Sequence, residues 1–198
     1  MGDYNVKLAS LIGSRICHDL ISPIGAITNG LELIELSGAA QGPEMDLIGD
    51  SVASAGARIR FFRIAYGAAG EQMLGRTEVA AVLRDISRAS RVEINWQPTD
   101  PHPRALVRLA FLALQCCETA MPYGGTVRIA EEAGAWTVKG AAEKLNVDTA
   151  LWDGLTVPGG GAEVTPAQVQ FALLPALAQD MGRSVAYGHD ATGVTIGF

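Results

Sequence analysis

The sequence predicts an α+β protein, in which a helical hairpin forms a dimeric four-helix bundle and precedes an α/β sandwich. Two long segments with apolar residues spaced three and four apart predict the hairpin. A breaker-rich stretch between them predicts the turn, and shorter strands and helices after residue 75 predict the sandwich. Because 48% of the 198 residues are hydrophobic, the chain can bury a substantial core.

The first predicted helix covers residues 4–36. Its apolar seam has the spacing of a coiled coil or helical bundle, at Leu20, Ile24, Ile27, Leu31 and Ile34. The stretch 37–43 (SGAAQGP) then ends the helix, because its glycines and proline break helical structure.

A second helix of similar length is expected to begin at Pro43, a residue that suits the first turn of a helix. Its seam consists of Met45, Ile48, Val52, Ala55, Ile59, Phe62 and Tyr66. The two helices predict an antiparallel hairpin domain at residues 1–70. One hairpin cannot bury both seams well, so a homodimer is expected; the alternative is a monomeric bundle closed by the rest of the chain.

A second domain is predicted at residues 76–198, after a glycine-containing linker at 67–75. Helices are expected at 77–89, with Thr77 as a possible cap, at 103–121 and at 165–181. Strands are expected at 91–97, 126–131, 136–139, 184–187 and 193–198. These elements predict one sheet covered by helices on one face.

Composition excludes several classes of partner. The formal net charge of −6 argues against nucleic acid, whose phosphates need clustered Lys and Arg. No apolar run approaches the ~18 residues of a membrane span, and no signal peptide is visible, so no membrane partner is expected. Three cysteines, of which Cys116 and Cys117 are adjacent, do not make a disulfide framework, so a reduced cytoplasmic location is expected.

His18 lies on the face of the first helix that points away from the apolar seam. An exposed imidazole is available to a partner, and the carboxylate of Asp19 can fix its tautomer and leave the other ring nitrogen as a nucleophile. Pro23 removes the hydrogen bond to the carbonyl of Asp19, so a bend is expected near His18.

Small side chains follow on the same outward face, at Ser22, Gly25 and Asn29. Such a surface allows another protein to approach closely, and Ile21 can supply an apolar contact. The alternative is a sparse solvent-exposed face.

The segment His18-Asp19-Leu20, followed by Pro23, resembles the H-box of sensor histidine kinases, in which the phosphorylated histidine precedes an acidic residue. The run from Arg15 to Glu32 (RICHDLISPIGAITNGLE) is similar to the ChpT-type bacterial histidine phosphotransferases. In that family a kinase-like dimerisation hairpin precedes a degenerate domain that resembles the ATP-binding domain of histidine kinases.

The resemblance implies a role for each matching residue. His18 would be the phospho-acceptor, and Asp19 its acid/base or orienting neighbour. Arg15, one turn before His18, would help neutralise the phosphoryl group at the partner-binding surface, with Arg60 and Arg63 as alternative cations. The rest of the docking surface would comprise Ile21, Ser22, Gly25 and Asn29.

The resemblance also locates where a kinase would hold Mg²⁺ and ATP. Cys116 and Leu112 occupy the places of the kinase asparagines, and neither ligates Mg²⁺ well because the metal prefers oxygen ligands. The glycine segment at 138–142 lacks the acidic residue and the second glycine, and 158–161 lacks a Lys or Thr to hold phosphates. No intrinsic cofactor is therefore expected, and Mg²⁺ would come from the receiver-domain partner.

The function implied is phosphoryl transfer between receiver-domain aspartates of response regulators, with a hybrid histidine kinase upstream. One alternative is a sensor-type histidine kinase that phosphorylates itself from ATP. Another is a non-enzymatic module that binds and sequesters a regulator. A metal site at His18 is not expected, because His102 and His189 lie far away in sequence with no ligand spacing.

Overall fold

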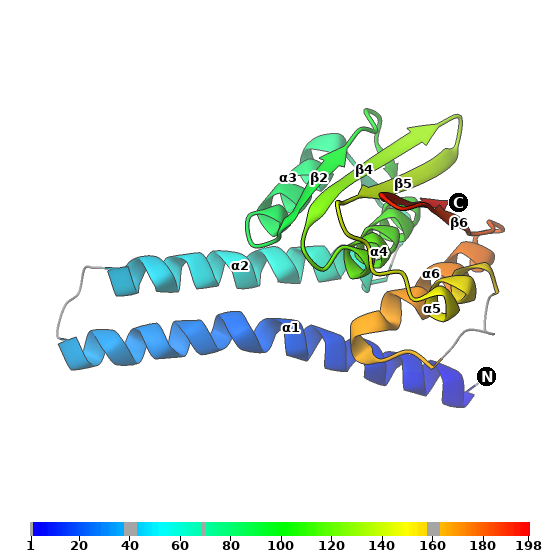
Figure 1. The fold of residues 1–198 in the computed structure, drawn as a ribbon. Coiled ribbons are helices and arrows are strands. Elements are labelled where there is room, and N and C mark those ends of the chain that lie inside the picture. Colours follow the sequence, from blue (N-terminus) through cyan, green and yellow to red (C-terminus); the bar gives the residue numbers. More distant parts are fainter. Residues whose placement is uncertain (1, 38–42, 69, 158–162) are drawn as a thin grey trace.

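The structure is a computed structural model that describes residues 2–37, 43–68, 70–157 and 163–198. A long helical hairpin extends from a sheet-containing C-terminal part (Figure 1). Most of the predicted turn at 37–43, and the predicted glycine-rich run at 158–161, lie outside the described residues. No helix in the described ranges is both long and apolar enough to cross a lipid bilayer.

The hairpin consists of α1 (Gly2–Ser37) and α2 (Pro43–Ala65), as predicted. Pro43 opens α2, and two carboxylates in its first turn stabilise the positive end of the helix dipole. Gly30 of α1 is buried against α2, and a Cβ atom built there would lie 2.6 Å from Ile48 Cγ1. The absence of a side chain at this glycine therefore allows the two helices to pack closely there.

α1 remains helical through Pro23, whose side chain is buried. Figure 1 shows that this helix bows near its middle, in keeping with the bend expected from proline.

The C-terminal part is built on a five-stranded sheet in the order β2-β4-β5-β7-β6. The strands are β2 (Val92–Trp96), β4 (Gly125–Glu132), β5 (Ala135–Ala141), β6 (Ala186–His189) and β7 (Gly193–Gly197). β2 and β4 are parallel, joined by a crossover through α4 (Arg104–Ala120), and the other neighbours are antiparallel.

One face of this sheet is covered by helices, as predicted. α3 (Arg76–Ser87) packs on β2, α4 packs on β4, β5 and β7, and α6 (Val169–Asp180) packs on α4. Alternation along the strands buries Val127, Ile129 and Val138 toward the helices and exposes Arg128 and Lys139 on the other face.

Several contacts join the hairpin to the C-terminal part, on both α1 and α2. Phe61 of α2 stacks on Phe111 of α4 with ring centroids 4.8 Å apart. The N-terminal half of α1 lies against α6 and the short 3₁₀ helix η2 (Pro166–Gln168). These contacts bring α4, a helix of the sheet-containing part, alongside the hairpin.

The structure corrects two of the predicted features around residue 75. α3 begins at Arg76 with Gly75 at its N-cap, so Thr77 does not cap it. The expected linker contains β1 (Met73–Leu74), which pairs with β3 (His102–Pro103). Leu74 is buried, which ties this segment to the core rather than leaving it as a free connection.

Residues 149–156, for which the sequence predicted no element, form α5 (Thr149–Asp153) and the 3₁₀ turn η1 (Gly154–Thr156). Both are too short to have a recognisable apolar period. The side chain of Asp148 caps α5 by accepting a hydrogen bond from Leu151 N, and Trp152 is buried.

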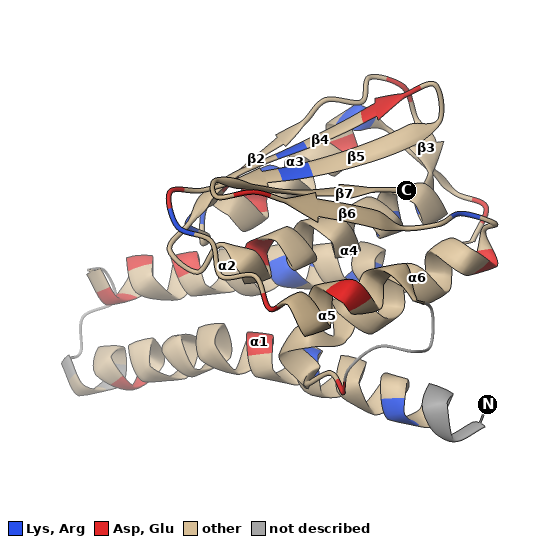
Figure 2. Ribbon diagram, turned by 45° about the vertical axis from the view of Figure 1, so that its right-hand side comes forward, with Lys and Arg blue, Asp and Glu red and all other residues tan. Residues whose placement is uncertain are grey.

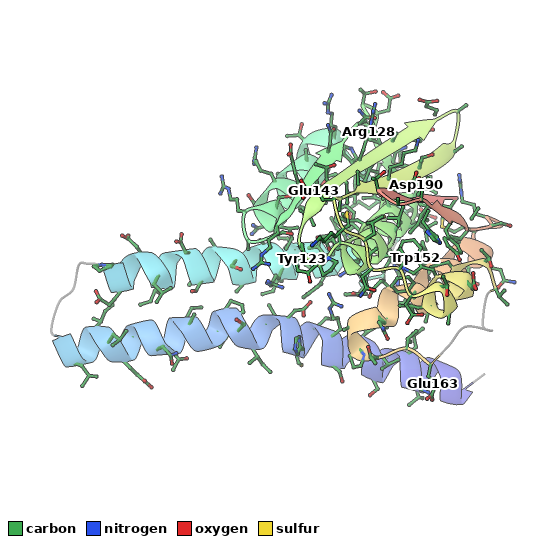
Figure 3. The ribbon with its side chains drawn as sticks, viewed as in Figure 1. Tyr123, Arg128, Glu143, Trp152, Glu163 and Asp190 are labelled. Atoms are coloured by element: carbon green, nitrogen blue, oxygen red, sulfur yellow. The ribbon has the colours of Figure 1, made fainter. Side chains whose placement is uncertain are left out.

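Replacement of Phe111 by Ala is expected to lower the free energy of unfolding by about 3–5 kcal/mol, because it opens a cavity where α4 meets α2. Urea denaturation followed by circular dichroism measures this change. Tyr123→Ala, at an exposed aromatic residue after α4 (Figure 3), serves as the control and should change stability by about 0.5 kcal/mol or less. Equal losses in the two variants would contradict the assigned contact.

Candidate functional site

His18 lies on the outer face of α1 with 83% of its side chain exposed, so the predicted exposure is confirmed. Its Nδ1 atom is 3.1 Å from Asp19 Oδ1. A carboxylate only accepts hydrogen bonds, so this contact places the ring proton on Nδ1. The lone pair of Nε2 is then the nucleophile of the neutral ring.

Asp19 is held in turn by Arg15, whose Nε donates to Asp19 Oδ2 over 2.7 Å. The two residues are four apart on α1, a spacing that brings side chains together, and only 14% of Asp19 and 19% of Arg15 is exposed. Arg15 Nη1 also donates to the carbonyl oxygen of Ala167, in η2 of the C-terminal part. The predicted docking role of Arg15 therefore does not match its placement, because its guanidinium is turned inward by Asp19 and η2.

Further hydrogen bonds connect η2 to α6 and α4 within the C-terminal part. Gln170 Nε2 donates to the carbonyl of Ala167 over 3.1 Å and to Thr119 Oγ1 over 3.0 Å. Thr119 donates to the carbonyl of Gln115, and the hydroxyl of Tyr66 donates to Gln115 Oε1, both over 2.9 Å. Burial raises the pKa of Tyr66 to about 12, so its hydroxyl stays a donor at neutral pH.

The sequence analysis missed these polar partners. Gln115 and Thr119 lie in α4, a helix that is otherwise strongly apolar at its buried positions. Gln115, a buried polar residue within such a run, is the signal that could have indicated them, since buried polar groups need partners. Thr165 and Gln168 form a capping box at the start of η2. This pattern in the sequence could have indicated that a helical turn containing Ala167 begins there.

The predicted docking residues share one exposed face with His18. Ser22, Gly25 and Asn29 follow at intervals of four, three and four residues, and all are exposed, as is Ile21 beside them. A Cβ atom at Gly25 would meet no atom within 4 Å. α1 carries no charged residue between Asp19 and Glu32, and this stretch is tan in Figure 2. The face is therefore uncharged, and most of its side chains are small.

A groove of about 870 Å³ runs beside this face, between α1, α2 and the end of α3. Its lining includes the cations Arg58, Arg60 and Arg88. Arg60, one of the alternative cations, forms an ion pair of 2.9 Å with Asp85, and Arg63 is exposed.

The residues at the expected nucleotide site do not fit Mg²⁺ and ATP. Cys116 and Leu112 are fully buried in the core, where neither offers an oxygen ligand. Gly140 lies within β5, and a Cβ atom there would be 3.1 Å from Val194 Cγ2, so this glycine serves sheet packing. In the described part of the chain, no group of three or more His, Cys, Asp or Glu side chains is arranged to hold a metal.

Comparison with known proteins gives consistent matches. The family model for the histidine phosphotransferase C-terminal domain matches residues 76–193. Protein phosphotransferase ChpT of Brucella abortus (strain 2308) is 39% identical over 127 residues, which cover 63% of this chain and 60% of that protein's length. The 1.7 Å structure of a bacterial phosphotransferase superposes with a TM-score of 0.80 at 31% identity, over 97% of this chain and 95% of that one.

Proposed function

Since the chain belongs to the histidine phosphotransferase family, we propose that it carries a phosphoryl group on His18 between the aspartates of response-regulator receiver domains. The observation that supports this most is the exposed imidazole whose Nδ1 is held by Asp19. The burial of Cys116 and Leu112 argues against ATP as the phosphoryl source.

In the proposed reaction, Nε2 of His18 attacks the phosphorus of an aspartyl phosphate on one receiver. The Nε2–P bond forms as the bond between phosphorus and the aspartyl oxygen breaks, and the aspartate leaves as a carboxylate. The ring becomes a phosphoimidazolium, and Asp19 stabilises its positive charge through the Nδ1–H hydrogen bond. A second receiver's aspartate then attacks the same phosphorus and releases neutral His18.

The receiver would dock on the small, neutral face formed by Ile21, Ser22, Gly25 and Asn29, because this face continues directly from His18. The groove beside it is lined by three arginines and by the carboxylates of Asp50 and Asp85, which leaves one positive charge in excess toward the acidic pocket of a receiver. That pocket would also supply the Mg²⁺ of the reaction. A hybrid histidine kinase is the proposed upstream donor.

We further propose that the hairpin at residues 1–70 supplies both phosphotransfer and dimerisation, while residues 76–198 support it. Seam residues that the hairpin leaves about half exposed support the dimer, since a second hairpin would cover them. They are Ile24, Leu31, Met45, Val52 and Ile59.

His18→Ala is expected to abolish acid-labile labelling by a phosphorylated receiver, a loss of about a thousandfold or more, because it removes the nucleophile. His189→Ala, at another exposed histidine, is the matched control and should label like the wild type. Transfer by the His18 variant would contradict the assignment of His18 as the phospho-acceptor. Labelling of the wild type by ATP alone would favour the kinase alternative.

Gly25→Gln is expected to slow transfer from a receiver by about tenfold or more, because the side chain would obstruct the docking face. Gly13→Gln is the matched control, since Gly13 is also an exposed glycine of α1 with nothing near its Cβ position. Both changes should stabilise the helix by about 0.5–1 kcal/mol. The docking proposal fails if both variants transfer at the same rate.

Val52→Glu is expected to convert a dimer into single chains, because it places a charge in the seam. Light scattering would then give 20.7 kDa for the variant and twice that mass for the wild type. Val6→Glu, at an exposed valine near the start of α1, should leave the dimer intact. A wild type that weighs as one chain would rule out the dimer.

A further inference from the structure

Glu118 of α4 is an acidic residue on the side of this apolar helix that faces the hairpin. It lines a small polar cavity of about 140 Å³ together with Arg15 and Asp19 of α1 and Arg58 of α2. The cavity therefore lies directly behind the carboxylate that orients His18.

No ion pair within 4.0 Å joins Glu118 to Arg15 or Arg58, all of which lie in the described part of the chain. Both guanidinium groups nevertheless act on the Glu118 carboxyl electrostatically. Charges several ångströms apart interact more strongly at a partly buried site than in open water. Arg15 thus lies between two carboxyl groups: it bonds directly to Asp19 and faces Glu118 across the cavity.

The four groups form a balanced cluster when both carboxyls are ionised. Nε of Arg58 is buried with no hydrogen-bond partner. A nearby carboxylate such as that of Glu118 therefore stabilises this guanidinium. A neutral side chain at position 118 would leave the cluster with one excess positive charge. The Asp19 carboxylate would then be drawn more strongly to the arginines and would accept more weakly from the His18 ring.

We propose that Glu118 is a positioning residue for His18, which acts through the guanidinium of Arg15 and the carboxylate of Asp19. The inference rests on the proposed function, because it concerns the same phosphotransfer reaction. In its ionised form Glu118 balances Arg15, so Asp19 keeps its full strength as acceptor of the Nδ1–H hydrogen bond. The same balance favours the phosphoimidazolium cation that transfer forms.

The carboxyl of Glu118 changes its charge near neutral pH. Burial raises its pKa to about 7, the charges of Arg15 and Arg58 oppose this rise, and Asp19 adds to it. The His18 ring also contacts this cluster, through Asp19. Tyr66 and Cys117 interact with it electrostatically but stay uncharged near neutral pH, because burial raises the pKa of each to about 12. Glu118 is ionised above its pKa, so its support of His18 should grow as the pH rises through about 7.

The test compares Glu118→Gln with the wild type in transfer from a phosphorylated receiver, between about pH 5.5 and about pH 8.5. The ratio of wild-type to variant rate should be near one at the acidic end and rise to about tenfold at the alkaline end, with a midpoint near 7. Titrations common to both proteins, such as those of the receiver, cancel in this ratio. Glu118→Asp, which keeps the charge, should restore most of the alkaline rate.

Glu132→Gln is the matched control, because it removes an exposed carboxylate from the far end of β4 and should give a ratio near one at every pH. A ratio for Glu118→Gln that does not change with pH would overturn the positioning role and leave only a structural one. Failure of the proposed function itself is distinguishable, because His18→Ala would then still transfer.

A second measurement on the wild type serves if the Gln variant does not fold. The ¹³C signal of the Glu118 carboxyl and the ring ¹⁵N signals of His18 would be followed together through the same pH range. An inflection of the His18 ring signals at the midpoint of the Glu118 titration is expected. Ring signals that do not respond at that midpoint would overturn the proposal.

Discussion

The ion pair between Arg15 and Asp19 is the interaction on which the geometry of the candidate site depends. It fixes the carboxylate that holds Nδ1 of His18, and it ties α1 to η2 through the carbonyl of Ala167. On an isolated, solvated helix such a pair would contribute little. Here the C-terminal part covers both side chains, so the hairpin and the sheet-containing part together position the imidazole.

The same covering gives the C-terminal part a role in the proposed transfer that does not require a bound nucleotide. α4 buries Leu112 and Cys116 in the core, which preserves the packing of the fold. The helix turns Gln115, Glu118 and Thr119 toward the hairpin instead, where they face or bond to the groups behind His18. In the proposed function this helix supports the nucleophile rather than a phosphate donor.

Much of the fold could be predicted from local patterns. The spacing of apolar residues predicted α1 and α2, and a strongly apolar run predicted α4. The outward position of His18 follows from helical geometry alone. The inward turn of Arg15 could not be predicted, because it depends on a carbonyl 152 residues away in the sequence. For the same reason the pairing of Leu74 with His102 and the bonds of Gln170 to α4 are visible only in three dimensions.

The most direct test of the account locates the phosphoryl group itself. Nitrogen-15 and phosphorus-31 NMR of the wild-type protein, mixed with a phosphorylated receiver domain, identifies the nitrogen that is bonded to phosphorus. The account predicts a phosphoryl group on Nε2 of His18 with the proton retained on Nδ1, beside Asp19. A phosphoryl group on Nδ1 of His18, or on any other residue, would contradict it.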